Sequence, residues 1–365
     1  MKQLVIEKED LKHNINKVKQ FAKNSTIIGV VKGNGYGLDL IEYSRFLVNN
    51  GIEYLAVATI EEALKLSKEN ICNNILLMSV INDKTELEQL VKNKIIITVG
   101  SNENVKAINE LAKKGYNIKV HIKIDTGFGR YGFMHNDQEN IIKAIKSLLE
   151  NNVEIEGVFS HLSDAYQKNN KHTIEQFENF RSVLKALEKN NINISLKHIC
   201  NSPAFLNYPE MHLNAVRIGS AFVGRVCSEN NIGLKRIAEL EISIAEVREV
   251  PENHTISYLN SYKTKSKTKI AVIPIGYLEG FHIAQKTDMF RMIDKLRRIV
   301  REIKSFFKKS KLTAVINDKR YDIIGTIGMY HIVVDVTGGN VKAGDIAYLE
   351  VNPLYISKEI ERLYR

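Results

Sequence analysis

Residues 26–38 read TIIGVVKGNGYGL, an apolar run that ends at Lys32 and continues directly into a glycine-rich loop. The run predicts a buried strand, because strands of a parallel sheet read as nearly continuous β-branched and aliphatic segments. A lysine at the end of such a strand places a cation at the edge of the sheet. Glycines after it let a ligand approach the backbone closely. The stretch therefore predicts a strand that presents an amine to a binding site.

Seven further apolar runs follow, and amphipathic helical patterns such as DLIEYSRFLVNNG separate them. Eight strands alternating with helices over about 220 residues match a (β/α)8 barrel better than an open doubly wound sheet. No GxGxxG motif follows the first strand, which argues against a dinucleotide-binding fold. The predicted strands are TIIGVVK (26–32), YLAVAT (54–59), NILLMS (74–79), IIITVG (95–100), NIKVHIKID (117–125), IEGVFSHL (155–162), LKHICN (196–201) and AVRIGSAFVG (215–224).

The pattern changes after about residue 235, where short strands with turns between them replace the strand–helix alternation. Such a pattern is typical of a mostly antiparallel β-domain. We therefore predict an α/β fold with a barrel over residues 8–232 and a β-domain over residues 233–365. The opening strand, residues 1–7, is expected to pair with the β-domain.

Composition limits the function. The chain has 365 residues, a formal charge of +10 and three cysteines, Cys72, Cys200 and Cys227, without CxxC spacing. The cysteines predict neither a disulfide framework nor a metal site and fit a reducing, cytoplasmic location. No apolar h-region opens the chain, and no run of eighteen apolar residues would span a membrane. No nucleic-acid partner is expected, since no reading motif accompanies the basic charge.

Much of the positive charge lies in residues 288–311, which hold nine lysines and arginines against three acidic residues. Apolar residues recur there at helical spacing, which predicts a basic amphipathic helix inserted into the β-domain. Three interpretations are open: the helix at 289–311 packs on its own dimer, it docks on a partner protein, or it contacts an anionic membrane surface.

Polar residues mark five of the eight predicted strand ends. Taken singly, each has an ordinary explanation, such as a solvated charge or a hydrogen-bonded core residue. The carboxyl ends of barrel strands form the active-site rim, so their convergence predicts a site. A lysine there can form a Schiff base with an aldehyde cofactor such as pyridoxal 5'-phosphate (PLP). The rim residues are Lys32, Lys123, Asp125, Arg130, His161, Asn201, Ser202, Arg217 and Gly219.

The segment VVKGNGYG resembles the PLP-lysine motif of alanine racemases. The resemblance extends in order through KIDTGFGRYGF, FSHLSDAY, CNSPAF, VRIGSAFVG, IGYLEGF and GTIGMYHIVVDVT. It implies a PLP-dependent racemase that interconverts L- and D-alanine and supplies D-amino acid for peptidoglycan. It also implies a homodimer with shared active sites, in which the β-domain of one chain lies over the barrel of its partner.

The resemblance implies a role for each matching residue. Lys32 would hold PLP and act as one base, and Tyr277 from the partner subunit would be the opposite base. Arg217 would face the pyridine nitrogen with His161 behind it. Lys123 matches a position that is often carbamylated. Tyr36, Asn201, Ser202, Gly219 and Tyr355 would bind the cofactor, chiefly at its phosphate, and Arg130 and Met329 would contact the substrate carboxylate region.

Three departures from the family pattern stand out. First, the usual Cys-Met-Asp triplet reads Gly328-Met329-Tyr330. Second, Gly33 and Gly35 replace common alanines and should make the loop more flexible. Third, residues 288–311 are an insertion. Because Tyr330 changes the substrate entrance, a serine or broad-specificity racemase is an alternative to an alanine racemase. A barrel-type PLP decarboxylase and a PLP-binding protein without racemase activity are alternatives of other classes.

Overall fold

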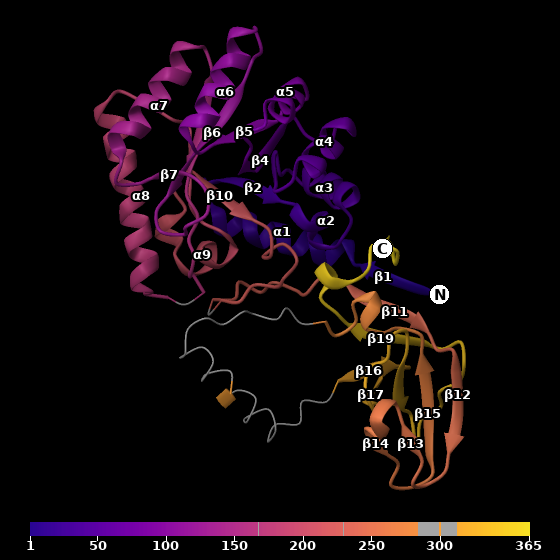
Figure 1. The fold of residues 1–365 in the computed structure, drawn as a ribbon. Coiled ribbons are helices and arrows are strands. Elements are labelled where there is room, and N and C mark those ends of the chain that lie inside the picture. Colours follow the sequence, from indigo (N-terminus) through magenta and orange to yellow (C-terminus); the bar gives the residue numbers. More distant parts are fainter. Residues whose placement is uncertain (167, 229, 284–298, 301–311) are drawn as a thin grey trace. The chain divides into compact units, whose positions relative to one another are not determined.

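The computed structural model describes residues 1–166, 168–228, 230–283, 299–300 and 312–365 (Figure 1). These residues form two compact units, one of Glu7–Ile237 and one that joins Met1–Ile6 to Ala238–Arg365. The predicted helix at 288–311 lies outside the described residues, apart from residues 299 and 300.

The first unit is a closed barrel of parallel strands. Each strand pairs with its neighbours in the order β5-β4-β3-β2-β10-β9-β8-β6, and pairing of β5 with β6 closes the ring. The short strand β7 (Phe133–Met134) adds to β6. The predicted fold class is confirmed. The barrel strands are β2 (Thr26–Val30), β3 (Tyr54–Val57), β4 (Asn74–Val80), β5 (Ile96–Val99), β6 (Lys119–Asp125), β8 (Glu154–Phe159), β9 (Leu196–His198) and β10 (Ala215–Ile218).

Helices surround the barrel strands (Figure 1). Short polar residues begin several of them: the Ser101 and Asp83 side chains accept hydrogen bonds from backbone N–H groups of the first turn, which would otherwise lack partners. The helices are α1 (Lys8–Ala22), α2 (Lys32–Tyr36), α3 (Leu40–Asn49), α4 (Ile60–Lys68), α5 (Lys84–Lys92), α6 (Asn102–Lys113), α7 (Gln138–Glu150), α8 (Lys171–Lys189), α9 (Ser202–Asn207) and the 3-10 turn η1 (Pro209–Met211).

The barrel interior has an apolar side and a polar side. Side chains alternate across a strand, so every second residue points inward. Strands β2 to β5 and the start of β10 contribute the buried cluster Ile28, Val30, Ala56, Leu76, Ile96 and Ala215. Strands β6, β8 and β9 and the end of β10 contribute buried ionisable groups instead, namely His121, Lys123, Glu156, His198 and Arg217. The polar side is therefore where the chemistry of the barrel concentrates.

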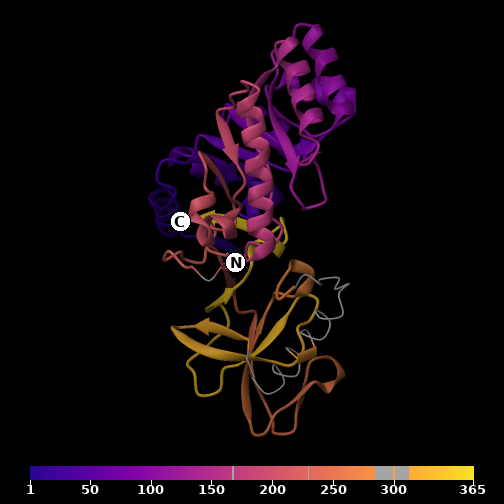
Figure 2. The ribbon, with the colours of Figure 1, turned by 90° about the vertical axis from the view of Figure 1, so that its left-hand side faces the viewer.

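The second unit is a nine-stranded sheet in the order β12-β15-β18-β17-β16-β19-β11-β1-β20, antiparallel except where β1 meets β20, and Figure 2 shows its strong twist. Strand β1 also pairs antiparallel with β11. The sheet strands are β1 (Lys2–Ile6), β11 (Glu239–Ser243), β12 (Glu246–Val250), β15 (Thr268–Ile273), β16 (Thr313–Ile316), β17 (Lys319–Ile324), β18 (Ile332–Asp335), β19 (Ile346–Glu350) and β20 (Glu361–Tyr364).

Short elements complete this unit: a hairpin of β13 (Thr255–Ile256) with β14 (Tyr262–Lys263), and the 3-10 turns η2 (Tyr258–Asn260), η3 (Tyr277–Glu279) and η4 (Pro353–Tyr355). Its core is aliphatic and includes Leu240, Ile242, Ile273, Val334 and Leu349. Among the described residues, no helix is both long enough and apolar enough to cross a membrane. Cys72, Cys200 and Cys227 are not in disulfide bonds.

Candidate active site

The loop after β2 turns with a left-handed backbone. Gly33, Asn34 and Gly35 have φ values of 68°, 55° and 65°. A residue with a Cβ loses roughly 1–2 kcal/mol in this conformation, whereas glycine adopts it freely. The two glycines that replace the common alanines therefore suit the turn that follows Lys32.

Glu62, in the first turn of α4, holds this loop in place by accepting hydrogen bonds from its backbone. Its Oε1 atom accepts hydrogen bonds from the backbone N–H groups of Gly33 at 2.7 Å and Asn34 at 3.2 Å. Its own backbone N–H donates to Thr59 Oγ1 at the start of α4. Sequence reasoning did not identify Glu62 as a site residue. The T-x-x-E spacing signals a helix start, but nothing in it indicates that the carboxylate reaches another loop.

The Lys32 amine lies among positive charges. Burial, followed by the nearby Arg130 and Arg217 side chains, lowers its pKa, and Glu62 opposes this shift. A lowered pKa increases the population of the neutral amine, which is the nucleophilic and basic form. The lysine is therefore prepared both for covalent attachment to a carbonyl compound and for proton transfer.

Arg217 is buried, with 3% of its surface exposed, and its guanidinium is held on several sides. Its Nη2 atom donates to the carbonyl oxygens of Ser160 at 2.8 Å and Ile199 at 3.0 Å, and lies 3.3 Å from His161 Nδ1. Burial lowers the pKa of Arg217 to about 10, so the side chain stays charged near neutral pH. Burial and Arg217 lower the pKa of His161 well below its usual value. The predicted pair of Arg217 and His161 lies together, with a neutral imidazole beside a fixed cation.

Tyr36, Ser202 and Gly219 also converge. The N–H groups of Gly219 and Ala221 donate to Ser202 Oγ at 3.1 and 3.2 Å. A Cβ atom on Gly219 would lie 2.3 Å from the Tyr36 hydroxyl, so only glycine fits there. Burial raises the pKa of Tyr36 to about 12, which keeps the phenol a donor. The two N–H groups orient the Ser202 hydroxyl, and the hydroxyls of Tyr36 and Ser202 are donors that fit an anionic group such as a phosphate. Asn201 instead caps α9, where its Oδ1 accepts from the Ala204 N–H.

Strand β6 ends in a cluster of charges. Lys123 Nζ donates to the carbonyl oxygen of Ile124 at 2.6 Å. Burial, with Arg217 and then Arg130 adding to it, lowers the pKa of Lys123 to about 7, although Asp125 opposes the shift. Asp125 Oδ1 accepts from the backbone N–H groups of residues 127 to 129. The Arg130 guanidinium lies 4.4 Å from the centre of the Phe128 ring. Asp125 thus fixes the loop that carries Arg130.

The remaining predicted residues belong to the β-domain. The N–H of Tyr277 donates to the Gly328 carbonyl at 3.1 Å, and the N–H of Leu278 donates to the Met329 carbonyl at 3.3 Å. The Ser357 N–H, just after the turn that carries Tyr355, donates to the Glu279 carbonyl at 3.1 Å. Tyr277, Met329 and Tyr355 therefore lie on three adjoining loops of this unit. Tyr277 is 43% exposed and Tyr330 is 57% exposed.

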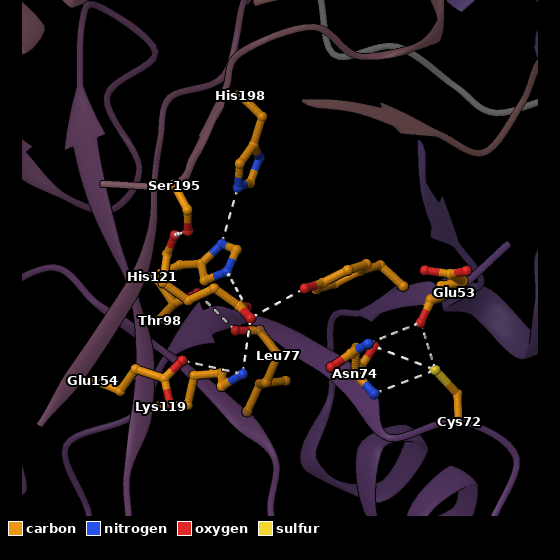
Figure 3. Close-up of polar contacts among 12 residues, drawn as sticks. Glu53, Cys72, Asn74, Leu77, Thr98, Lys119, His121, Glu154, Ser195 and His198 are labelled. Atoms are coloured by element: carbon orange, nitrogen blue, oxygen red, sulfur yellow. Dashed lines mark hydrogen bonds and ion pairs between the residues drawn. The ribbon is translucent and has the colours of Figure 1, made fainter. Parts of the chain in front are cut away.

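The polar side of the barrel contains three residues that sequence reasoning missed: His121, Glu156 and His198 (Figure 3 labels the two histidines). A usable signal existed in NIKVHIKID, where Lys119, His121 and Lys123 alternate and so share one face of the strand. Among the described residues, no group of three or more His, Cys, Asp or Glu side chains is placed to hold a metal ion.

Comparison with known proteins identifies relatives for both units. The family profile for the alanine racemase N-terminal domain matches residues 6–226, and the profile for the C-terminal domain matches residues 237–356. An alanine racemase from Methanococcus maripaludis is 36% identical over 344 residues, covering 92% of this chain and 85% of the relative. An alanine racemase from Clostridium perfringens is 34% identical over 346 residues, covering 93% and 83%. The solved alanine racemase of Clostridium difficile 630 has a TM-score of 0.85 at 28% identity, covering 100% of this chain and 95% of that one.

A parallel barrel with a lysine and an arginine at its carboxyl rim is followed by an antiparallel β-domain, and the family profiles that match both units identify an isomerase of the amino-acid racemase type. The chain belongs to the alanine racemase family. The resemblance predicted from the sequence motifs is confirmed, and so is the enzyme class. The relatives support alanine racemase activity for this protein.

Proposed function

We propose that this protein uses PLP, held covalently by Lys32, to interconvert L- and D-alanine by proton transfer between two bases. One observation carries the proposal: the Lys32 amine is buried close to Arg130 and Arg217, and burial and these two positive charges lower its pKa. When bound, PLP withdraws electrons from the Cα atom of an amino acid and so acidifies its proton.

The described residues fit that cofactor. The hydroxyls of Tyr36 and Ser202 would donate to its phosphate, and the absence of a side chain at Gly219 leaves room for the Tyr36 hydroxyl beside them. Arg217 would face the pyridine nitrogen. An arginine keeps its proton under ordinary conditions, so it would leave that nitrogen unprotonated. Negative charge would then stay closer to Cα, which favours return of the proton there over transamination.

Two bases are needed because racemisation removes a proton from one face of Cα and delivers one to the other. Lys32 Nζ would serve the D face, and Tyr277 of the partner subunit would serve the L face. Each proton-transfer group should contribute roughly 10²–10⁴ in rate. Arg130 and the backbone at Met329 would bind the substrate carboxylate, and Tyr355 would contribute to phosphate binding.

A homodimer is part of this proposal. Large apolar side chains lie exposed around the Tyr277 turn, and such patches are typical of surfaces that a partner covers. They are Tyr277, Leu278, Met329, Tyr330 and Leu354. A second copy of the chain over this surface would bring Tyr277 to an active site made mainly by its partner's barrel.

Alanine is the first choice of substrate, because the named relatives are alanine racemases. The D-alanine formed would supply peptidoglycan synthesis. A serine or broad-specificity racemase is the second candidate, and the exposed ring of Tyr330 in place of an acidic side chain is the observation that favours it. A panel of L- and D-amino acids separates the two, and a preference for serine over alanine would overturn the first choice.

The covalent link is tested by borohydride reduction of the PLP-saturated protein, followed by peptide mapping. We expect the label on Lys32 alone. A label on another lysine, or none, would refute the assignment. Exchange of the alanine Cα hydrogen in deuterated water then distinguishes a racemase from a protein that merely holds the cofactor. Release of carbon dioxide would instead indicate a decarboxylase.

A further inference from the structure

A chain of hydrogen bonds runs through the barrel interior, starting from Arg217. Its Nη1 atom lies 2.6 Å from His198 Nδ1, and His198 Nε2 lies 2.9 Å from His121 Nδ1. His121 Nε2 lies 3.0 Å from Glu156 Oε2. Figure 3 shows the two imidazoles joined end to end, with the chain continuing toward Lys119. Both histidines are fully buried.

The far end of the chain is anchored at the opposite end of the barrel strands. Glu156 Oε1 accepts hydrogen bonds from Lys119 Nζ at 2.9 Å and from the Tyr54 hydroxyl at 3.1 Å. Lys119 and Tyr54 are the first residues of β6 and β3, whereas Arg217 lies near the end of β10. The chain therefore connects the amino end of the barrel to the proposed cofactor site.

The direction of every hydrogen bond in this chain is determined by its two ends. Arginine can only donate, so His198 Nδ1 must be the acceptor, and the proton of a neutral His198 lies on Nε2. That proton is donated to His121 Nδ1, so the His121 proton also lies on Nε2 and is donated to Glu156. A carboxylate can only accept, so no donor meets another donor along the chain. One pair of tautomers satisfies all members at once.

The protonation states agree with this geometry. Burial lowers the pKa of His121 although Glu156 opposes the shift, and burial together with Arg217 lowers the pKa of His198 well below its usual value. Burial opposes ionisation of Glu156, but the hydrogen bonds from His121 and Lys119 outweigh it and lower its pKa to about 2. Both imidazoles are therefore neutral near neutral pH, and the carboxylate is charged.

The tautomer of His198 affects the orientation of the Arg217 guanidinium. If His198 carried its proton on Nδ1, two donors would face each other at the 2.6 Å contact, and the guanidinium would have to turn away. Carbonyl oxygens and His161 hold the Nη2 side. On the Nη1 side both contacts are to His198, the ring nitrogen at 2.6 Å and a longer hydrogen bond to its carbonyl oxygen at 3.3 Å. The orientation of the Nη1 side depends on His198, which depends on His121 and, through it, on Glu156.

We propose that Glu156, His121 and His198 are positioning residues that lock one tautomer along the chain and so hold Arg217 in a single orientation toward the cofactor. This inference rests on the role proposed above for Arg217. The three residues do not touch the substrate. They act through the arginine, and they fill the side of the barrel interior that lacks an apolar core.

The direct test is nitrogen-15 NMR of histidine side chains in the full-length protein, with assignments from His121→Gln and His198→Gln. We expect both residues as neutral Nε2–H tautomers that do not titrate between pH 6 and pH 8.5. An Nδ1–H tautomer at either residue, or titration of either ring in this range, overturns the proposal. The measurement requires neither cofactor nor a variant of Glu156.

The functional test compares Glu156→Gln with Glu154→Gln. Glu154 also pairs with Lys119, at 3.2 Å, but its side chain is 63% exposed, whereas that of Glu156 is 9% exposed. In Glu156→Gln the amide can donate to His121 and reverse the chain, so we expect an Nδ1–H population and a loss of about 10–100-fold in kcat. Glu154→Gln should keep the tautomers and stay within about twofold in kcat.

If Glu156→Gln kept both histidine tautomers and the parent kcat, the proposal would be refuted. It would also be refuted if this variant kept the tautomers and lost only stability. Failure of the proposed cofactor chemistry would be recognised separately, because Lys32 would then take no borohydride label.

Discussion

Lys123 is expected to react with carbon dioxide near neutral pH. In this step the neutral Nζ attacks the carbon of CO2, an N–C bond forms, and Nζ releases one proton to water. With a pKa of about 7, about half of the Lys123 side chains are neutral at pH 7, against about one in 3,000 for a lysine with a pKa of 10.5. The carbamate would also place a negative charge near Arg217 and Arg130, replacing repulsion between cations by attraction.

Carbon-13 NMR with labelled bicarbonate tests this prediction. We expect a carbamate signal at pH 7–8 in the unsubstituted protein and none in Lys123→Met. Lys119, on the same strand, is an internal control, because its bonds to Glu156 and Glu154 outweigh burial and raise its pKa. A signal that survives in Lys123→Met, or no signal at saturating bicarbonate, would refute the reasoning.

Lys123 should also make the free energy of unfolding depend on pH in bicarbonate-free buffer. The pKa of Lys123 is lower in the folded protein than in the unfolded chain, so the unfolded chain binds more protons between about pH 7 and pH 10.5. The free energy of unfolding should therefore rise with pH across this window. One pKa unit corresponds to about 1.4 kcal/mol, so the contribution approaches about 5 kcal/mol. Urea denaturation at pH 7 and pH 9 should show a smaller rise in Lys123→Met.

Three further substitutions, and Tyr330→Phe as a control, test other parts of the protein. Tyr277→Phe should slow exchange of the Cα hydrogen of L-alanine by roughly 10²–10⁴, and racemisation in both directions with it, but leave cofactor binding intact. Tyr330→Phe should stay near the parent. Equal exchange rates from both enantiomers in Tyr277→Phe would contradict the two-base assignment. Lys2 pairs with Glu279, whose Oε2 is buried without a hydrogen-bond partner among the described residues. Lys2→Met should therefore cost roughly 1–3 kcal/mol of stability, measured by denaturation. Glu62→Gln removes the charge that raises the pKa of Lys32, so the acidic limb of the rate profile should move to lower pH; a limb that moves upward would show that Glu62 acts otherwise.

The sequence predicted the barrel because its strands are continuous apolar runs separated by amphipathic helices. It also predicted the rim residues, because topology places every strand end on one edge. Lys32 and Arg217 were therefore identified from position alone. Residues in the middle of strands could not be identified from position in this way. The alternation of Lys119, His121 and Lys123 indicates a polar strand face, but nothing in the sequence pairs His121 with Glu156, and only the closed ring brings the two within 3.0 Å of each other.

The sequence also did not predict the backbone conformation of the loop after Lys32. Gly33 and Gly35 suggested a more flexible loop, whereas the positive φ values show a defined left-handed turn that glycine favours. The anchoring of that turn by Glu62 depends on the pairing of β3, which precedes α4, with β2, and no local pattern records this pairing. The Lys2–Glu279 pair likewise joins residues that are 277 positions apart in the sequence.

Strand β1 has a consequence for how the chain is made. It lies between β11 and β20 in the sheet, so one of its partners is residues 239–243 and the other is residues 361–364. During synthesis from the N-terminus, residues 2–6 leave the ribosome long before either partner exists, while the whole barrel emerges in between. Strand β1 must therefore wait for β20, and completion of this sheet is a late step in the synthesis of these two units.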